Sequence, residues 1–149
     1  MAEKYRVRIV QNTIRASIPG QGPQGPQGIP GPAGGTAVTY PAGENLAAGR
    51  VVIIEGGEAF LFQPGDTTHQ GRAYGITTAA ANMGEDVTIQ IGGEITNAAF
   101  TFGADSELWV FNNGIIVDTA PVVSVIQSAG VSAGNLTMRI NFNISILTS

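Results

Sequence analysis

Residues 136–146 read LTMRINFNISI, and their side chains alternate between two chemical classes. Leu, Met, Ile and Phe residues take every second position, and Thr, Arg, Asn and Ser take the positions between them. A period of two is typical of a β-strand with one buried face. Because so long an apolar face has to be covered, the pattern predicts that this strand packs on another sheet or on other copies of the chain.

Shorter apolar runs separated by turn residues lie upstream of this strand. Three pairs of runs flank a Gly-Gly or Asn-Gly link, which readily adopts the positive φ of a type I′ turn. The predicted hairpins join 50–54 to 58–62, 87–91 to 94–96, and 108–112 to 115–117. Further candidates are strands at 99–102 and 122–126, and single helical turns at 44–48 and 77–83. The sequence predicts an all-β fold in which residues 36–149 form an antiparallel sandwich or barrel of about eight to ten strands.

Residues 20–35 have a different composition, rich in glycine, proline and glutamine. Glycine recurs at every third position, at Gly22, Gly25, Gly28, Gly31 and Gly34. Three polyproline II chains can wind together only when glycine takes every third place, since no side chain fits at the axis. A plain Pro/Gly linker shares the composition but needs no strict phase. The register predicts a collagen-like triple helix, hence a homotrimer, and a stalk of roughly 40 Å at about 3.1 Å per residue.

So few triplets would not hold three chains together unaided, and the flanking regions are therefore expected to trimerise as well. On the N-terminal side, residues 1–19 form a basic arm. Residues 5–10 and 13–18 alternate as two short strands would, with Gln11 and Asn12 between them. An isolated two-stranded hairpin is marginal in water, so the arm is expected to need a partner.

The charge is divided unevenly along the chain. Residues 1–35 hold four basic residues and one acidic residue, a net +3, whereas the remainder holds three basic and ten acidic residues, a net −7. This asymmetry favours an arm that docks on an acidic protein surface or, less readily, on nucleic acid, although a solvated strand face would also explain it. The candidate anchoring residues are Lys4, Arg6, Arg8, Ile9, Arg15 and Ile18. Nucleic acid is not an expected partner, because no aromatic residue beyond Tyr5 is interleaved for base stacking.

Little in the sequence points to catalysis. There is no Cys, and the only histidine, His69, lies in a polar stretch and is expected to be an exposed loop residue. Glu85 and Asp86 are neighbours that would point to opposite faces of a strand, and Glu55 and Glu58 flank a turn. Neither pair is a predicted acid–base pair. We therefore expect no enzymatic activity, no cofactor and no metal.

Trp109 alternates with Leu108 and Val110 in a predicted strand. It is a candidate for core packing, for a subunit contact or for an aromatic platform under a glycan. No run approaches the roughly 18 apolar residues of a membrane span, and charges at Lys4 and Arg6 stand where a signal peptide needs an apolar stretch. The chain is therefore expected to be made in a cytoplasm and to have no membrane partner.

Two parts of the chain carry a resemblance to structural proteins of tailed bacteriophages. Residues 4–28, KYRVRIVQNTIRASIPGQGPQGPQG, resemble the N-termini of phage fibre proteins with short collagen-like stalks. Residues 44–57, ENLAAGRVVIIEGG, followed by residues 71–95, GRAYGITTAAANMGEDVTIQIGGEI, are similar to a β domain of phage head decoration and fibre proteins. The resemblance implies a homotrimer that is built into the virion and has no catalytic activity.

The expected function is that of a head fibre or capsid decoration protein. Its arm would attach to virion structural proteins, its β domain would project outward, and assembly would take place in the host bacterial cytoplasm. The alternative is a tail fibre or receptor-binding protein that recognises a host surface glycan through Trp109 or the segment around His69. The sequence has no evident metal-binding tip repeat and no intramolecular chaperone domain, which favours the first interpretation.

Overall fold

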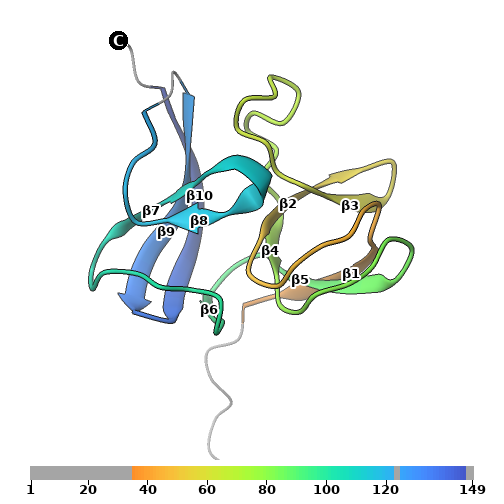
Figure 1. Ribbon diagram of the computed structural model, residues 1–149, viewed down its shortest axis with the longest axis horizontal. Coiled ribbons are helices and arrows are strands. Elements are labelled where there is room, and N and C mark those ends of the chain that lie inside the picture. The colour runs from red at the N-terminus through yellow and green to blue at the C-terminus, as the bar shows by residue number, and fades with distance from the viewer. Residues whose placement is uncertain (1–34, 123–124, 147–149) are drawn as a thin grey trace, which may run out of the picture.

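The computed structural model describes residues 35–122 and 125–146 of the 149-residue chain. The predictions for the arm, residues 1–19, and for the glycine repeat lie outside these residues. The described residues form ten β-strands and one short 3-10 turn, Asn112–Gly114, and the strands make two five-stranded antiparallel sheets (Figure 1). The prediction of an all-β antiparallel fold is confirmed. In this part of the chain, no helix is long and apolar enough to cross a membrane.

The first sheet, which we call the barrel sheet, curls until its edges meet. Its strands, in spatial order, are β1 (Ala37–Pro41), β5 (Asp86–Gln90), β4 (Gly75–Thr77), β2 (Val51–Glu55) and β3 (Glu58–Leu61). Just after β1, Ala42 forms a parallel bridge with Ala59 of β3, and the Gly43 N–H donates to the Ala59 carbonyl over 2.9 Å. The two edge strands are therefore linked, as in a small barrel.

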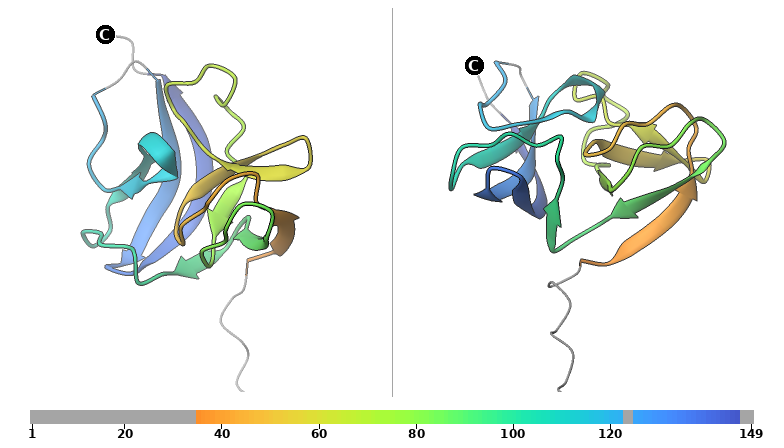
Figure 2. Two further views of the ribbon diagram at one scale, coloured as in Figure 1. Left: turned by 45° about the vertical axis from the view of Figure 1, so that its right-hand side comes forward. Right: turned by 60° about the horizontal axis from the view of Figure 1, so that its bottom comes forward.

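The second sheet, which we call the long-strand sheet, stands beside the barrel sheet (Figure 2). Its strands, in spatial order, are β6 (Glu94–Thr96), β10 (Thr137–Ile146), β9 (Val125–Gly134), β7 (Glu107–Val110) and β8 (Ile116–Val117). The predicted strand at 136–146 is confirmed as β10, which pairs with β9 over most of its length. The two sheets have separate registers and meet only through packed side chains and connecting loops.

Two apolar clusters hold the fold together, and β2 contributes to both. One fills the space between the sheets and includes Val51 and Ile53 of β2 with Leu108, Val110, Met138 and Ile140 of the long-strand sheet. The other lies inside the barrel sheet and includes Val52 of β2 with Ala42, Leu46, Ala59, Ala81, Val87 and Ile89. A strand that is buried on both faces needs an unbroken apolar run, which explains the sequence VVII at 51–54.

Two of the three predicted hairpins are confirmed. β2 and β3 pair across Gly56 and Gly57, whose φ angles are 59° and 88°. β7 and β8 pair across a longer connection, residues 111–115, in which Asn113 and Gly114 have φ angles of 58° and 64°. Both links have the positive φ that their sequences predict.

The third predicted hairpin, between 87–91 and 94–96, is wrong. β5 pairs with β1 and β4, whereas β6 pairs with β10 in the other sheet. The glycines at 92 and 93 carry the chain from one sheet to the other (Figure 2). The physical reason is that Ile89 is buried inside the barrel sheet while Ile95 is buried between the sheets, so the two strands serve different clusters.

Three of the remaining local predictions, the strand at 99–102 and the helical turns at 44–48 and 77–83, are wrong because loops supply part of the core. Residues 99–102 form no strand, yet Phe100 and Phe102 are buried between the sheets with their ring centroids 4.9 Å apart. Residues 44–48 and 77–83 form no helical turns, and instead Leu46 pairs with Ala81 in an isolated bridge. In the 122–126 region the described strand, β9, begins at Val125.

Candidate interaction surfaces

We call the described residues, 35–122 and 125–146, the body. The body is tightly packed where it begins, directly after the glycine repeat. A Cβ atom on Gly35 would lie 1.2 Å from the carbonyl oxygen of Gly92, so only glycine fits here. The N–H of Ile91 donates to the Thr36 carbonyl over 2.9 Å, and β1 begins at the next residue. The chain is thus fixed to the link between β5 and β6. This junction lies at the opposite end of the body from the end of β10 (Figure 1).

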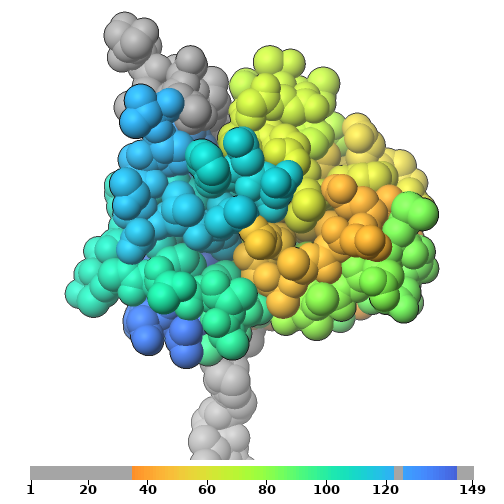
Figure 3. All heavy atoms as spheres, viewed as in Figure 1, coloured from red at the N-terminus to blue at the C-terminus, as the bar shows by residue number. Residues whose placement is uncertain are grey.

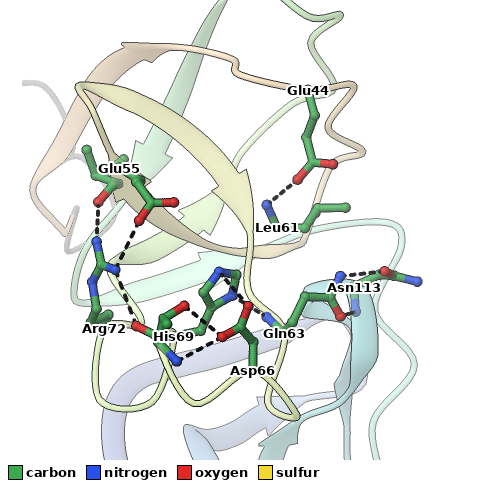
Figure 4. Close-up of polar contacts among 10 residues, drawn as sticks. Glu44, Glu55, Leu61, Gln63, Asp66, His69, Arg72 and Asn113 are labelled. Atoms are coloured by element: carbon green, nitrogen blue, oxygen red, sulfur yellow. Dashed lines mark hydrogen bonds and ion pairs between the residues drawn. The ribbon is translucent and has the colours of Figure 1, made fainter.

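His69 lies in the loop between β3 and β4, and its environment differs from the prediction. Its side chain is only 12% exposed, with Nδ1 accepting a hydrogen bond of 3.0 Å from the Gln63 N–H (Figure 4). Its Nε2 lies 3.7 Å from Oδ2 of Asp66. The expectation of an exposed loop residue is wrong, because the loop folds back and uses the ring as an internal acceptor.

Asp66 fixes the same loop through a local turn. Its Oδ1 accepts hydrogen bonds from the Thr68 N–H, at 2.8 Å, and from the Thr68 hydroxyl, at 2.7 Å. These bonds stabilise the carboxylate and hold the pKa of Asp66 below its ordinary value, with a smaller contribution from His69. The carboxylate therefore organises the loop and is not poised as a general base.

Arg72 ties the far end of this loop to β2. Its guanidinium donates to Oε1 of Glu55 over 3.3 Å and to the Ile54 carbonyl over 3.1 Å (Figure 4). Glu58 lies directly opposite Glu55 in the β2–β3 register, at an exposed hairpin end. The two carboxylates are thus cross-strand neighbours, and the Glu55 carboxylate is engaged by Arg72. Among the described residues, no three His, Asp or Glu side chains converge as metal ligands would.

An open polar depression lies between this loop and the β7–β8 turn. It has a volume of about 700 Å³ and is lined by Gln63, Gly65, Asp66, Thr67, Asn112 and Asn113. Gln63 and Asn113 join its two walls, since the Gln63 amide donates to Asn113 Oδ1 over 2.7 Å and accepts from the Asn113 N–H over 3.0 Å. The loop and the turn lie against each other on the surface (Figure 3).

Trp109 lies on the side of the long-strand sheet that faces away from both clusters. Leu108 and Val110 are fully buried between the sheets, so the alternation of β7 turns Trp109 to the opposite side, where it is half-buried. Its cross-strand neighbours are Val117 of β8 and Ser128 of β9. Trp109 therefore belongs to neither apolar cluster, so of the three roles considered for it, packing in these clusters is excluded.

We use the name outer face for this side of the sheet. One row of residues across it consists of Val117, Trp109, Ser128 and Asn143. A second row consists of Glu107, Val131, Arg139 and Glu94, in which Arg139 Nη2 lies 3.0 Å from Glu94 Oε1. Val131 is 46% exposed, and Phe111, two residues beyond Trp109, is 41% exposed. The outer face thus combines exposed apolar side chains with a central row that has no charged residue, whereas its second row contains Glu107, Arg139 and Glu94.

The other residues predicted from the sequence fall outside the described part of the chain. They are the anchoring candidates Lys4, Arg6, Arg8, Ile9, Arg15 and Ile18, and the repeat glycines Gly22, Gly25, Gly28, Gly31 and Gly34. The sequence interpretation missed the packed junction at Gly35. A signal was present, since Gly35 directly follows Gly34 and so stands out of the three-residue register.

Neither a protein family model nor a curated protein sequence matches the chain.

Proposed function

We propose that this chain is a structural virion protein of a bacteriophage, a trimeric head fibre or capsid decoration protein. Residues 1–19 attach it to the particle, residues 20–35 form a short triple-helical stalk, and the β body projects outward. The observation that carries the proposal is the unbroken glycine register from Gly22 to Gly34, which stops one residue before the packed Gly35. A flexible linker would require neither the phase nor a tightly fitted end.

The contacts of the body support a structural role. Several of its carboxylates hold loops: Glu55 binds Arg72, Glu85 accepts from the Asn82 N–H over 2.9 Å, and Asp118 accepts from the Gly103 N–H over 2.8 Å. None of these arrangements brings two carboxylates together in a cleft. We assign the protein no enzymatic activity and no cofactor. The resemblance of residues 4–28 and 44–57 to phage fibre and decoration proteins supports a place in the virion.

The trimer is tested on the full chain by native mass spectrometry. We expect a mass of three chains, together with a triple-helix signal in circular dichroism. Gly28→Ala places a methyl group at the crowded axis and should lower the melting temperature of this signal. Gln27→Ala is the matched control, because the same new side chain then stands at an outward position. A stable monomer at micromolar concentration would remove the basis of the proposal.

Attachment is tested by binding the full chain to purified particles that lack it. If the arm adds a strand to the edge of a virion protein, raising the salt concentration should barely change binding. If Lys4, Arg6, Arg8 and Arg15 act through their charges, high salt should weaken it. Electron microscopy of intact particles then locates the protein on the head or the tail. Absence of the protein from the particle would contradict both forms of attachment.

The polar depression beside the β7–β8 turn favours a second candidate function, recognition of a host surface glycan. Amide and carboxylate side chains such as Gln63, Asp66 and Asn112 supply the donors and acceptors that sugar hydroxyls need. Glycan-array binding by the full chain that is lost in Asn112→Ala, with the fold intact, would support this function. If glycan binding is lost in Trp109→Ala instead, the glycan site lies on the outer face.

A further inference from the structure

We propose that the outer face is the surface through which the β bodies of neighbouring copies of this chain contact each other. The central row of this face is Val117, Trp109, Ser128 and Asn143. This inference rests on the proposed trimer and identifies the surface through which the β bodies of its subunits contact each other. The occupant of the outer face is thus a second copy of the same chain.

A trimer of this chain needs a contact between its β bodies. The glycine register between Gly22 and Gly34 is too short to hold three chains together by itself. Each body is fixed to the end of the repeat at Gly35, so a short stalk confines three identical bodies to one small volume. Tethering of this kind produces effective concentrations on the order of millimolar, at which even a weak surface associates.

Charge is distributed unevenly over the surface of the β body. The chain beyond residue 35 has three basic and ten acidic residues, so copies of the body repel each other through most of their surfaces. The central row of the outer face has no charged side chain. The neighbouring row contains both signs, with Arg139 between Glu94 and Glu107. Five of the ten acidic residues of this part of the chain lie on the barrel side, namely Glu44, Glu55, Glu58, Glu85 and Asp86.

In a single copy of the chain, the outer face leaves apolar surface in contact with water. The solvent side of an antiparallel sheet is normally polar, yet the outer face presents Trp109, Val117 and Val131 away from both clusters. Aromatic residues are enriched and charged residues are depleted at the centres of protein interfaces. The central row of the outer face has both features, since it contains Trp109 and no charged residue.

Trp109 makes this proposal measurable, because it is the only tryptophan in the chain. In the full-length trimer we expect blue-shifted Trp109 emission and little quenching by acrylamide. Val131→Arg places a charge within the contact and should raise the quenching constant several-fold and shift the emission to the red. Ser128→Arg should do the same. The matched control is Met83→Arg, since Met83 is 70% exposed on the barrel side and its replacement should leave the emission unchanged.

The outcomes separate this inference from the proposed trimer. The wild-type protein could have a native mass of three chains while its Trp109 is quenched as strongly as in Val131→Arg. This result would overturn the outer-face contact but not the trimer. A monomeric wild-type mass would overturn both. If Trp109 becomes shielded only when particles or glycans are added, the occupant is one of those and the proposed contact between copies is wrong. Far-ultraviolet circular dichroism identifies a variant that has failed to fold, in which case the other arginine variant decides.

Discussion

Gly35 is the residue at which the glycine repeat is joined to the body. A methyl group there would overlap the Gly92 carbonyl oxygen, so β1 would have to move away from the link that follows β5. We expect Gly35→Ala to lower the free energy of unfolding by about 1–3 kcal/mol, as overpacking commonly does. Urea denaturation monitored by circular dichroism measures the change.

Gly65→Ala is the control for this substitution. A Cβ atom on Gly65 would meet no other atom within 4 Å, so the free energy of unfolding should change by less than about 0.5 kcal/mol. Equal stability of the two variants would contradict the tight fit at Gly35. It would also weaken the argument that the repeat is fixed directly on the body.

Asp66 provides a pH-dependent contact at the scale of one side chain. Because its bonds to Thr68 lower its folded pKa below the ordinary 3.8, they contribute stability above that ordinary value. The contribution is lost as the pH falls through the lowered folded pKa. We expect the amide resonance of Thr68 to move on acidification from about pH 5 to about pH 1. In Asp66→Asn, which keeps an acceptor oxygen, it should stay in place, and a resonance that titrates equally in both proteins would refute the assignment.

At the scale of the element, β2 should be the most sensitive strand because each of its faces belongs to a different cluster. Ile53 faces the space between the sheets and is fully buried, so Ile53→Ala should cost about 2–5 kcal/mol of unfolding free energy. Val52→Ala should also destabilise the protein, since Val52 faces the interior of the barrel sheet. Val122→Ala is the control, because this side chain is 101% exposed. A neutral Val52→Ala would show that the second cluster contributes little.

The sequence predicts the strands of this fold better than it predicts their partners. The glycine pairs at 56–57 and 92–93 have the same turn chemistry, yet one closes a hairpin and the other links two sheets. A turn signal reports where the chain bends, whereas the choice of neighbour depends on which cluster buries the flanking residues. Phe100 and Phe102 illustrate the same limit, since their alternation is that of a strand but a loop places them in the core.

The candidate surfaces were predictable to a similar extent. Alternation along β7 predicts that Trp109 and Leu108 face opposite sides, but not which side is covered by the second sheet. The exposed Val131 could not be identified from the sequence, because the register shift between β7 and β9 decides which β9 residues share a side with Trp109. The role of His69 as an acceptor was equally hidden, since it depends on how the loop folds back onto Gln63.

At the scale of the whole molecule, the chain combines a basic arm with an acidic body. The two regions carry net charges of +3 and −7, so salt should act on them in opposite directions. Attachment of the arm through its charges would weaken as salt screens it. Association of the bodies, which repel each other, would strengthen, because the Debye length falls from about 30 Å at 0.01 M salt to about 8 Å at 0.15 M.

We therefore expect acrylamide quenching of Trp109 in the full-length protein to decrease when salt is raised from about 0.01 M to about 0.15 M. Screening removes the repulsion between acidic bodies while leaving the apolar contact of the outer face intact, so the bodies close and shield the ring. Val131→Arg should remain strongly quenched throughout, because its contact is disrupted at any salt concentration. Quenching of the wild-type protein that rises with salt would mean that charge attraction, and not apolar contact, holds the bodies together.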